Sequence, residues 1–298
     1  MKKRGGSPGR PVEGKDDEYS PNSTRRTGRH CVDGSRDSAK RKMADQLTNS
    51  PGDASNRPLP TIEDQRQFWD WHWQNWEKRK VLNDWTERRA QEIVDLVRNL
   101  PVARPRMLDF GCGHGWFTER LADLGEAHGI DLSPEGIAAA QARRPDVAYI
   151  AGDIYDAPLP KDYFDIVVSQ EVIAHVQDQK KYIERAADLL RAGGYLIVTT
   201  GNKFVIDRLG EVGWVKQPPQ HIRQELSHAQ LKKLLSSQFK ILKTFTIIPQ
   251  GQVGLLRAVN SYKLNSFARL FLSQEKIDRF KERAGFGWQM IFLAQKKT

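Results

Sequence analysis

The sequence has few cysteines and no long apolar segment. Only two of its 298 residues are cysteine, Cys31 and Cys112, which is too few for a disulfide framework. No apolar run approaches the ~20 residues that a membrane-spanning helix needs. The basic N-terminus lacks the apolar core of a secretory signal. These absences lead us to expect a cytoplasmic protein without a membrane span.

Positive charge is concentrated in the N-terminal tail. The net charge is +10, but residues 1–42 hold 12 lysines and arginines against 6 acidic residues, so the remaining 256 residues carry only +4. A basic tail can attach a protein to nucleic acid, although Tyr19 is the one aromatic residue in it that could stack on a base. We therefore expect a small-molecule partner and keep nucleic-acid binding through the tail as an alternative. The sequence leaves the oligomeric state open.

Large apolar residues are almost absent from residues 1–60, which are rich in glycine, proline, serine and arginine. Such a segment buries too little surface to offset the entropy of ordering. A disordered basic tail is therefore predicted, with Met43 as an alternative start of translation. Residues 61–298 are expected to form one domain.

A helical cap is predicted over residues 61–100. Trp69, Trp73 and Trp76 follow the spacing i, i+4, i+7 and share one helical face, while His72 is expected to lie off that face. Two interpretations stay open for the tryptophans. They pack as an apolar cover, or their rings stabilise a cationic ligand by about 0.5–2 kcal/mol.

Short apolar runs alternate with helical segments from Arg106 onward. The predicted strands are 106–110, 127–132, 147–151, 164–169, 195–200, 239–248 and 288–294. The predicted helices are 82–100, 116–124, 134–143, 180–191, 227–237, 266–272 and 273–284. Gly193 and Gly194 are expected to end the helix over 180–191. Apolar strands that alternate with helices indicate a parallel sheet, and right-handed crossovers make it a doubly wound, Rossmann-like α/β fold.

A glycine-rich turn follows the first predicted strand. Gly111, Gly113 and Gly115 have the spacing G-x-G-x-G, and Trp116 stands where a dinucleotide-binding loop has its third glycine. This substitution disfavours nicotinamide and flavin dinucleotides, and the lysine of a P-loop is also missing. Asp131 ends the second strand 20 residues after Gly111, where a carboxylate can accept hydrogen bonds from ribose hydroxyls.

Five segments, in this order and spacing, resemble the class I S-adenosylmethionine-dependent methyltransferases. They are 108–115 (LDFGCGHG), 129–133 (GIDLS), 152–154 (GDI), 164–176 (FDIVVSQEVIAHV) and 189–198 (LLRAGGYLIV). The resemblance covers roughly residues 100–246. It implies a seven-stranded sheet with an antiparallel last strand, S-adenosylmethionine as cofactor, and a substrate lid formed by the insert over 249–285.

The resemblance also implies a role for each cofactor-binding residue. Asp109, Gly111 and Gly113 hold the methionyl part and Asp131 the ribose, while Asp153 and Ile154 lie at the adenine and Gln170 beside the sulfonium. The full set is Asp109, Gly111, Gly113, Asp131, Leu132, Asp153, Ile154 and Gln170.

Methyl transfer to a hydroxyl also needs a base, and two histidines, His175 and His221, are candidates, with Glu171 as the third predicted catalytic residue. Glu171 and His175 are four residues apart, which places them on one face of a helix after the fourth strand, and His221 follows the fifth strand. Segment 171–176 resembles the O-methyltransferases of ubiquinone biosynthesis, which have a second glutamate where this chain has Ala174. We therefore expect no required metal.

Three functions remain open from the sequence. The preferred one is methyl transfer to an oxygen or nitrogen of a small molecule. The alternatives are an RNA or protein methyltransferase that uses the basic tail to hold its substrate, and a module that binds the cofactor without catalysis.

Overall fold

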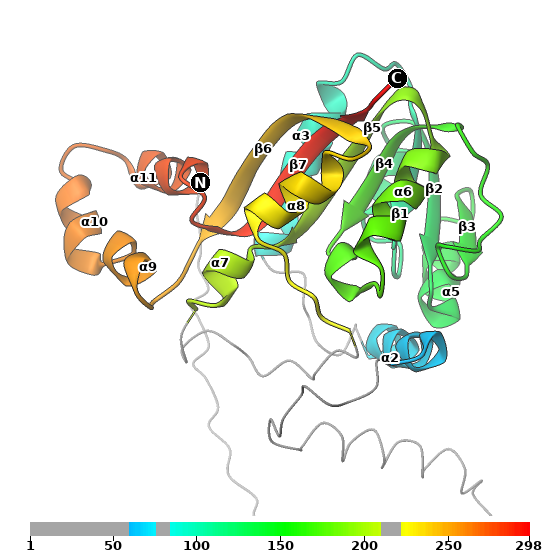
Figure 1. Ribbon diagram of the computed structural model, residues 1–298, viewed down its shortest axis with the longest axis horizontal. Helices are drawn as coiled ribbons and strands as arrows, with labels where there is room; N and C mark the ends of the chain where they lie inside the picture. The colour runs from blue at the N-terminus through cyan, green and yellow to red at the C-terminus, as the bar shows by residue number, and fades with distance from the viewer. Residues whose placement is uncertain (1–59, 76–83, 210–221) are drawn as a thin grey trace, which may run out of the picture. The chain divides into compact units, whose positions relative to one another are not determined.

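The computed structural model describes residues 60–75, 84–209 and 222–298 (Figure 1). The predicted disordered tail up to residue 59, together with Trp76 and His221, lies outside the described residues. None of the helices in the described ranges has the length and apolarity that crossing a bilayer requires.

Seven strands form one sheet in the order β3-β2-β1-β4-β5-β7-β6. The strands are β1 (Arg106–Phe110), β2 (Glu126–Asp131), β3 (Ala148–Ala151), β4 (Phe164–Gln170), β5 (Leu190–Gly201), β6 (Phe239–Pro249) and β7 (Gly287–Lys296). Strands β1 to β5 pair in parallel, and β7 runs antiparallel to both β5 and β6. This confirms the predicted Rossmann-like sheet with an antiparallel last strand. The strand order reverses between β1 and β4, which is where ligands bind in such sheets.

Helices cover both faces of the sheet (Figure 1). They are α2 (Ile62–Gln74), α3 (Asp84–Arg98), α4 (Thr118–Ala122), α5 (Pro134–Arg143), the 3-10 turn η3 (Ile173–His175), α6 (Gln179–Leu189), α7 (Lys203–Ile206), α8 (His228–Leu235), α9 (Leu255–Val259), α10 (Tyr262–Ala268) and α11 (Gln274–Arg283). Successive residues of β1 point to opposite faces of the sheet. Met107 packs with α3 and α4, and Leu108 packs with α6 and α8.

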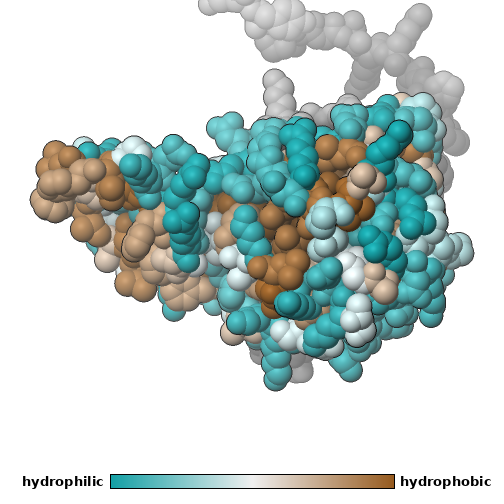
Figure 2. All heavy atoms as spheres, turned by 90° about the horizontal axis from the view of Figure 1, so that it is seen from above, coloured by the Kyte–Doolittle hydropathy of each residue, from teal (hydrophilic) through white to brown (hydrophobic). Residues whose placement is uncertain are grey.

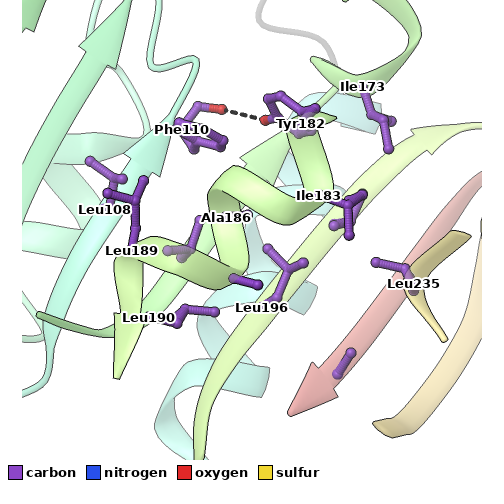
Figure 3. Close-up of a cluster of buried hydrophobic side chains, with 14 of the residues drawn as sticks. Leu108, Phe110, Ile173, Tyr182, Ile183, Ala186, Leu189, Leu190, Leu196 and Leu235 are labelled. Carbon is purple, nitrogen blue, oxygen red and sulfur yellow. Dashed lines mark hydrogen bonds between the residues drawn. The ribbon is translucent and has the colours of Figure 1, made fainter. Parts of the chain in front are cut away.

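The end of β1 is fixed by a buried tyrosine of α6 (Figure 3). The Tyr182 hydroxyl donates to the Phe110 carbonyl at 3.2 Å, and the two rings stack with centroids 4.7 Å apart. A second hydrogen bond of 2.9 Å joins the same hydroxyl to Ser169 Oγ in β4. The glycine-rich turn therefore leaves the sheet from a firmly held position.

Two sequence-based boundaries are wrong. The helix predicted to end at Gly193 ends at Leu189, because the fully buried Leu190 already pairs with Phe164 of β4. Gly193 instead adopts φ 70° inside β5. The helix predicted over 266–272 is displaced to α10, and the short α9 before it was not predicted.

Candidate functional site

A cavity of about 330 Å³ unites most of the predicted site residues, and it is lined by the ends of β1, β2 and β4 together with α2. All predicted cofactor residues except Gly113 line it: Asp109, Gly111, Asp131, Leu132, Asp153, Ile154 and Gln170. Glu171 and His175, two of the three predicted catalytic residues, line the same cavity. Distant parts of the sequence therefore meet at the point where the strand order reverses.

The glycine-rich turn folds over the end of β2. The Gly111 and Cys112 amides both donate to the Ile130 carbonyl at 2.9 Å. Gly111 has φ 95°, and a Cβ atom there would lie 2.3 Å from a methyl group of Val172. Gly113 has φ 55°, and a Cβ atom there would lie 2.3 Å from the Trp73 ring. Both positions therefore require glycine, since a side chain would be strained and would also collide with a packed neighbour.

Asp131 connects this turn with the start of α5. One carboxylate oxygen accepts from the Gly113 amide at 2.8 Å and the other from the Ser133 amide at 3.0 Å. Ser133 caps α5, because its hydroxyl accepts from the Gly136 amide. Each carboxylate oxygen has two lone pairs, so Asp131 keeps acceptor capacity toward the cavity.

The pKa values of two carboxyl groups in the cavity wall are raised. Burial raises the pKa of Asp131 to about 6, while hydrogen bonds from Ser133, Gly113 and Trp73 oppose the rise. Asp109 is 1% exposed, and burial raises its pKa to about 7 even though Thr118 donates a 2.7 Å hydrogen bond to it. Holding negative charge here is costly without a cation nearby, so the site favours a positively charged ligand.

Asp153 has a local structural role as well as a place in the cavity wall. Its carboxylate accepts from the Tyr155 amide at 3.0 Å, which closes the turn after β3. Ile154, the next residue, is buried beside it. The same two residues that the resemblance assigns to an adenine therefore combine a polar and an apolar surface.

Helix α2 covers the glycine-rich turn. The Trp73 ring stacks on His114 with centroids 4.9 Å apart, and Trp69 packs edge to face against His175 at 5.4 Å. The Ser133 hydroxyl donates to Asp70 and joins α2 to the start of α5. His72, expected to lie off the tryptophan face, lines the cavity too. Helix α2 therefore lines the cavity with His72 as well as with Trp69 and Trp73, which the tryptophan spacing alone does not predict.

Glu171 and His175 do not share a helical face, so that prediction is wrong. Glu171 has φ 58° directly after β4, and only residues 173–175 form a short 3-10 turn. Glu171 accepts from Thr199 Oγ1 at 3.1 Å, and burial is the main cause that raises its pKa.

His175 is held by a backbone carbonyl. Its Nδ1 lies 2.9 Å from the Ile222 oxygen. Because a carbonyl only accepts, the neutral ring carries its proton on Nδ1 and leaves Nε2 free of one. Burial lowers the pKa of His175, which keeps the ring neutral near pH 7. The side chain therefore has the protonation state that a general base requires.

Sequence reasoning missed Arg89 of α3. Its Nε donates to Gln170 Oε1 at 3.1 Å, and its Nη1 lies 3.7 Å from Glu171. Its side chain is only 12% exposed. Arg89 stands four positions before Ile93, which is buried, so the two side chains lie on the same face of α3. That spacing could have indicated that Arg89 faces the protein interior.

The sequence also predicts that no metal is required and that the insert over 249–285 forms a substrate lid. Within the described ranges, no cluster of three or more His, Cys, Asp or Glu side chains is arranged to hold a metal ion. The expectation that no metal is required stays a prediction. The structure describes the whole insert over 249–285, and no residue of the insert lines this cavity. Its role as a lid also stays a prediction.

The chain is similar to known methyltransferases. Residues 108–198 match the family model described as a methyltransferase domain. The ubiquinone biosynthesis O-methyltransferase of Cereibacter sphaeroides is 33% identical over 124 residues, which are 40% of this chain and 50% of that protein. The ajmaline N-methyltransferase of Rauvolfia serpentina is 37% identical over 108 residues, 33% of this chain and 37% of that protein. The chain thus spans half or less of the length of these relatives.

A solved structure shares the fold. The N-methyltransferase NodS of Bradyrhizobium japonicum WM9, in complex with S-adenosyl-L-homocysteine, superposes with a TM-score of 0.54 at 17% identity. The match covers 78% of this chain and 98% of NodS.

The raised pKa of Asp109 leads to a prediction about stability. The pKa in the folded chain is about 7 against an ordinary value of 3.8, so ionisation favours the unfolded state increasingly as pH rises between these values. Asp109→Asn keeps an acceptor for Thr118 and removes this penalty. The gain in the free energy of unfolding should be larger at about pH 8 than at about pH 5, as measured by urea unfolding. An equal gain at both pH values would contradict the buried, easily protonated carboxyl.

Proposed function

We propose that this chain, which carries a class I S-adenosylmethionine-dependent methyltransferase domain, transfers the cofactor's methyl group to an oxygen or nitrogen of a small molecule. The observation that carries the proposal is the single cavity in which the predicted cofactor residues face Glu171 and His175. The chain is similar both to an N-methyltransferase and to an O-methyltransferase, and both elements are therefore included as acceptor atoms.

The residues present fit S-adenosylmethionine. Asp131 keeps acceptor capacity toward the cavity for a ribose hydroxyl at the end of β2, and the glycine backbone at Gly111 and Gly113 permits close approach. The carboxyl group of Asp109 suits an ammonium group, because a neighbouring cation stabilises its charged form. The cofactor supplies an already activated methyl group, so the protein mainly has to align it and exclude water. Alignment of this kind contributes about 7–11 kcal/mol in favourable cases.

The acceptor side of the cavity contains His175, Glu171 and Arg89. Nε2 of the neutral His175 ring accepts the proton that a hydroxyl acceptor loses during transfer, or that a protonated amine loses before it attacks the methyl group. Arg89 lies beside Glu171 and holds Gln170, so it positions the carboxylate and the amide at the cavity wall. Trp69 packs against the histidine and restricts how its ring can turn.

The cover formed by α2 favours a small acceptor over a macromolecular one. Trp69, Trp73 and His72 all face the same cavity, which leaves little room for an extended nucleic-acid or peptide chain. The alternative function relied on the basic tail, whose residues 1–59 lie outside the described residues. Deletion of residues 1–42 distinguishes the small-molecule function from the macromolecular one. Turnover of a small acceptor should be unchanged by the deletion.

Asp131→Ala tests the cofactor site. The change removes a carboxylate that accepts charge-assisted hydrogen bonds worth about 1.5–3 kcal/mol each, so affinity for S-adenosylhomocysteine should fall at least about tenfold to a hundredfold. Isothermal titration calorimetry measures the affinity. Asp156→Ala is the matched control, because Asp156 is exposed and lies outside the cavity lining. Unchanged affinity in Asp131→Ala would show that the cofactor binds elsewhere.

His175→Gln tests the base. Loss of a general base lowers turnover by about a hundredfold to ten-thousandfold, while affinity for S-adenosylhomocysteine should stay the same. Turnover is followed as S-adenosylhomocysteine release over a panel of phenols, carboxylic acids and amines on which the wild-type chain is first shown to act. His228→Gln is the control, since His228 is exposed on α8 and outside the cavity. Full turnover in His175→Gln would rule out this base.

A further inference from the structure

The insert between β6 and β7 forms an arm, here defined as residues 253–283, which contains α9, α10 and α11. Helix α11 packs along β6, and α9 and α10 lie farther from the sheet (Figure 1). Large apolar side chains are exposed on this arm: Val253, Leu255, Tyr262, Leu264, Phe267, Leu270, Phe271, Leu272 and Phe280. Figure 2 shows much of the surface of the arm in brown, the colour of hydrophobic residues.

These exposed side chains are not needed to pack the arm. Leu256 and Ile277 are buried and hold α9 and α11 in place. In contrast, Phe271 and Phe280 are 73% and 72% exposed, and the Phe267 ring packs edge to face against the Phe271 ring with centroids 5.6 Å apart. Contiguous exposed apolar surface of this kind marks an interaction site.

The charge on the arm selects among possible partners. Six of its cations are exposed: Arg257, Lys263, Arg269, Lys276, Arg279 and Arg283. Glu275 is the exposed acid of the arm, since Asp278 is half-buried and Glu282 buried. A second copy of the chain would bring the same positive charge to the contact and be repelled. An anionic lipid surface complements both the cations and the apolar side chains.

An open cavity beside the arm adds to this complementarity. Its volume is about 1010 Å³, and Arg257, Arg269 and Lys281 line it together with Asp278. Lys281 is 8% exposed and donates to Asn260 Oδ1 at 3.3 Å, so its ammonium is held in place. Three cations against one carboxylate suit the phosphate of a lipid headgroup.

We propose that the arm docks this chain on the surface of an anionic membrane. Leu264, Phe267 and Phe271 enter the boundary between headgroups and acyl chains, and the surrounding lysines and arginines contact lipid phosphates. The docking does not depend on methyl transfer, because no residue of the arm lines the cofactor cavity.

Sedimentation of the full chain with vesicles tests the docking. Vesicles of equal parts phosphatidylcholine and phosphatidylglycerol should bind the chain, while vesicles of phosphatidylcholine alone should bind it much less, and added salt should weaken the binding. The double change Phe267→Ser and Phe271→Ser should weaken partition at least tenfold with an unchanged thermal unfolding temperature, because both rings are exposed. Leu242→Ser on β6, also an exposed leucine, is the control and should bind normally.

Three results would overturn the proposal. One is that the wild-type chain does not bind the anionic vesicles. Another is that it forms a dimer which the double change dissociates, since the arm would then bind a second copy. The third is normal binding by the double variant together with loss of binding on deletion of residues 1–42, since the basic tail would then be the membrane contact. Asp131→Ala should bind vesicles like the wild type, which separates this test from that of the cofactor site.

Discussion

The carboxylate of Asp131 is the interaction on which the rest of the site depends. It stands at the end of β2 and accepts hydrogen bonds from the Gly113 and Ser133 amides, so one side chain fixes both the glycine-rich turn and the start of α5. Ser133 in turn donates to Asp70 and attaches α2 to the same point. Helix α2, the glycine-rich turn and helix α5 are therefore all attached, directly or through Ser133, to the carboxylate of Asp131 at the edge of the sheet.

This arrangement places unusual electrostatic demands on the cavity. Burial raises the pKa of Asp109, Asp131 and Glu171, and the Arg89 guanidinium, 3.7 Å from Glu171, opposes the rise in the pKa of Glu171. A ligand with a sulfonium and an ammonium group stabilises the ionised carboxylates. The same field disfavours a ligand with several phosphates, which agrees with the absence of a P-loop lysine. Electrostatics and backbone shape thus select the same class of cofactor.

The sequence predicted the sheet and the glycine-rich turn because both follow from local patterns. Apolar runs identified the strands, and glycines that must adopt positive φ identified the turn. Other features depend on distant pairing and could not be predicted locally. Leu190 enters the sheet because it pairs with Phe164, and Glu171 adopts φ 58° where β4 meets its neighbours. Arg89 reaches Gln170 only once α3 has packed on the sheet.

The central claim is that a cationic cofactor binds against easily protonated carboxyls in this cavity. Titration calorimetry of S-adenosylmethionine into the chain at about pH 6.5, in buffers of different ionisation enthalpy, measures the protons exchanged on binding. Net proton release is expected, because a bound cation lowers the pKa of Asp109 and Asp131 from about 7 and about 6. Binding with no proton exchange, or with proton uptake, would contradict it.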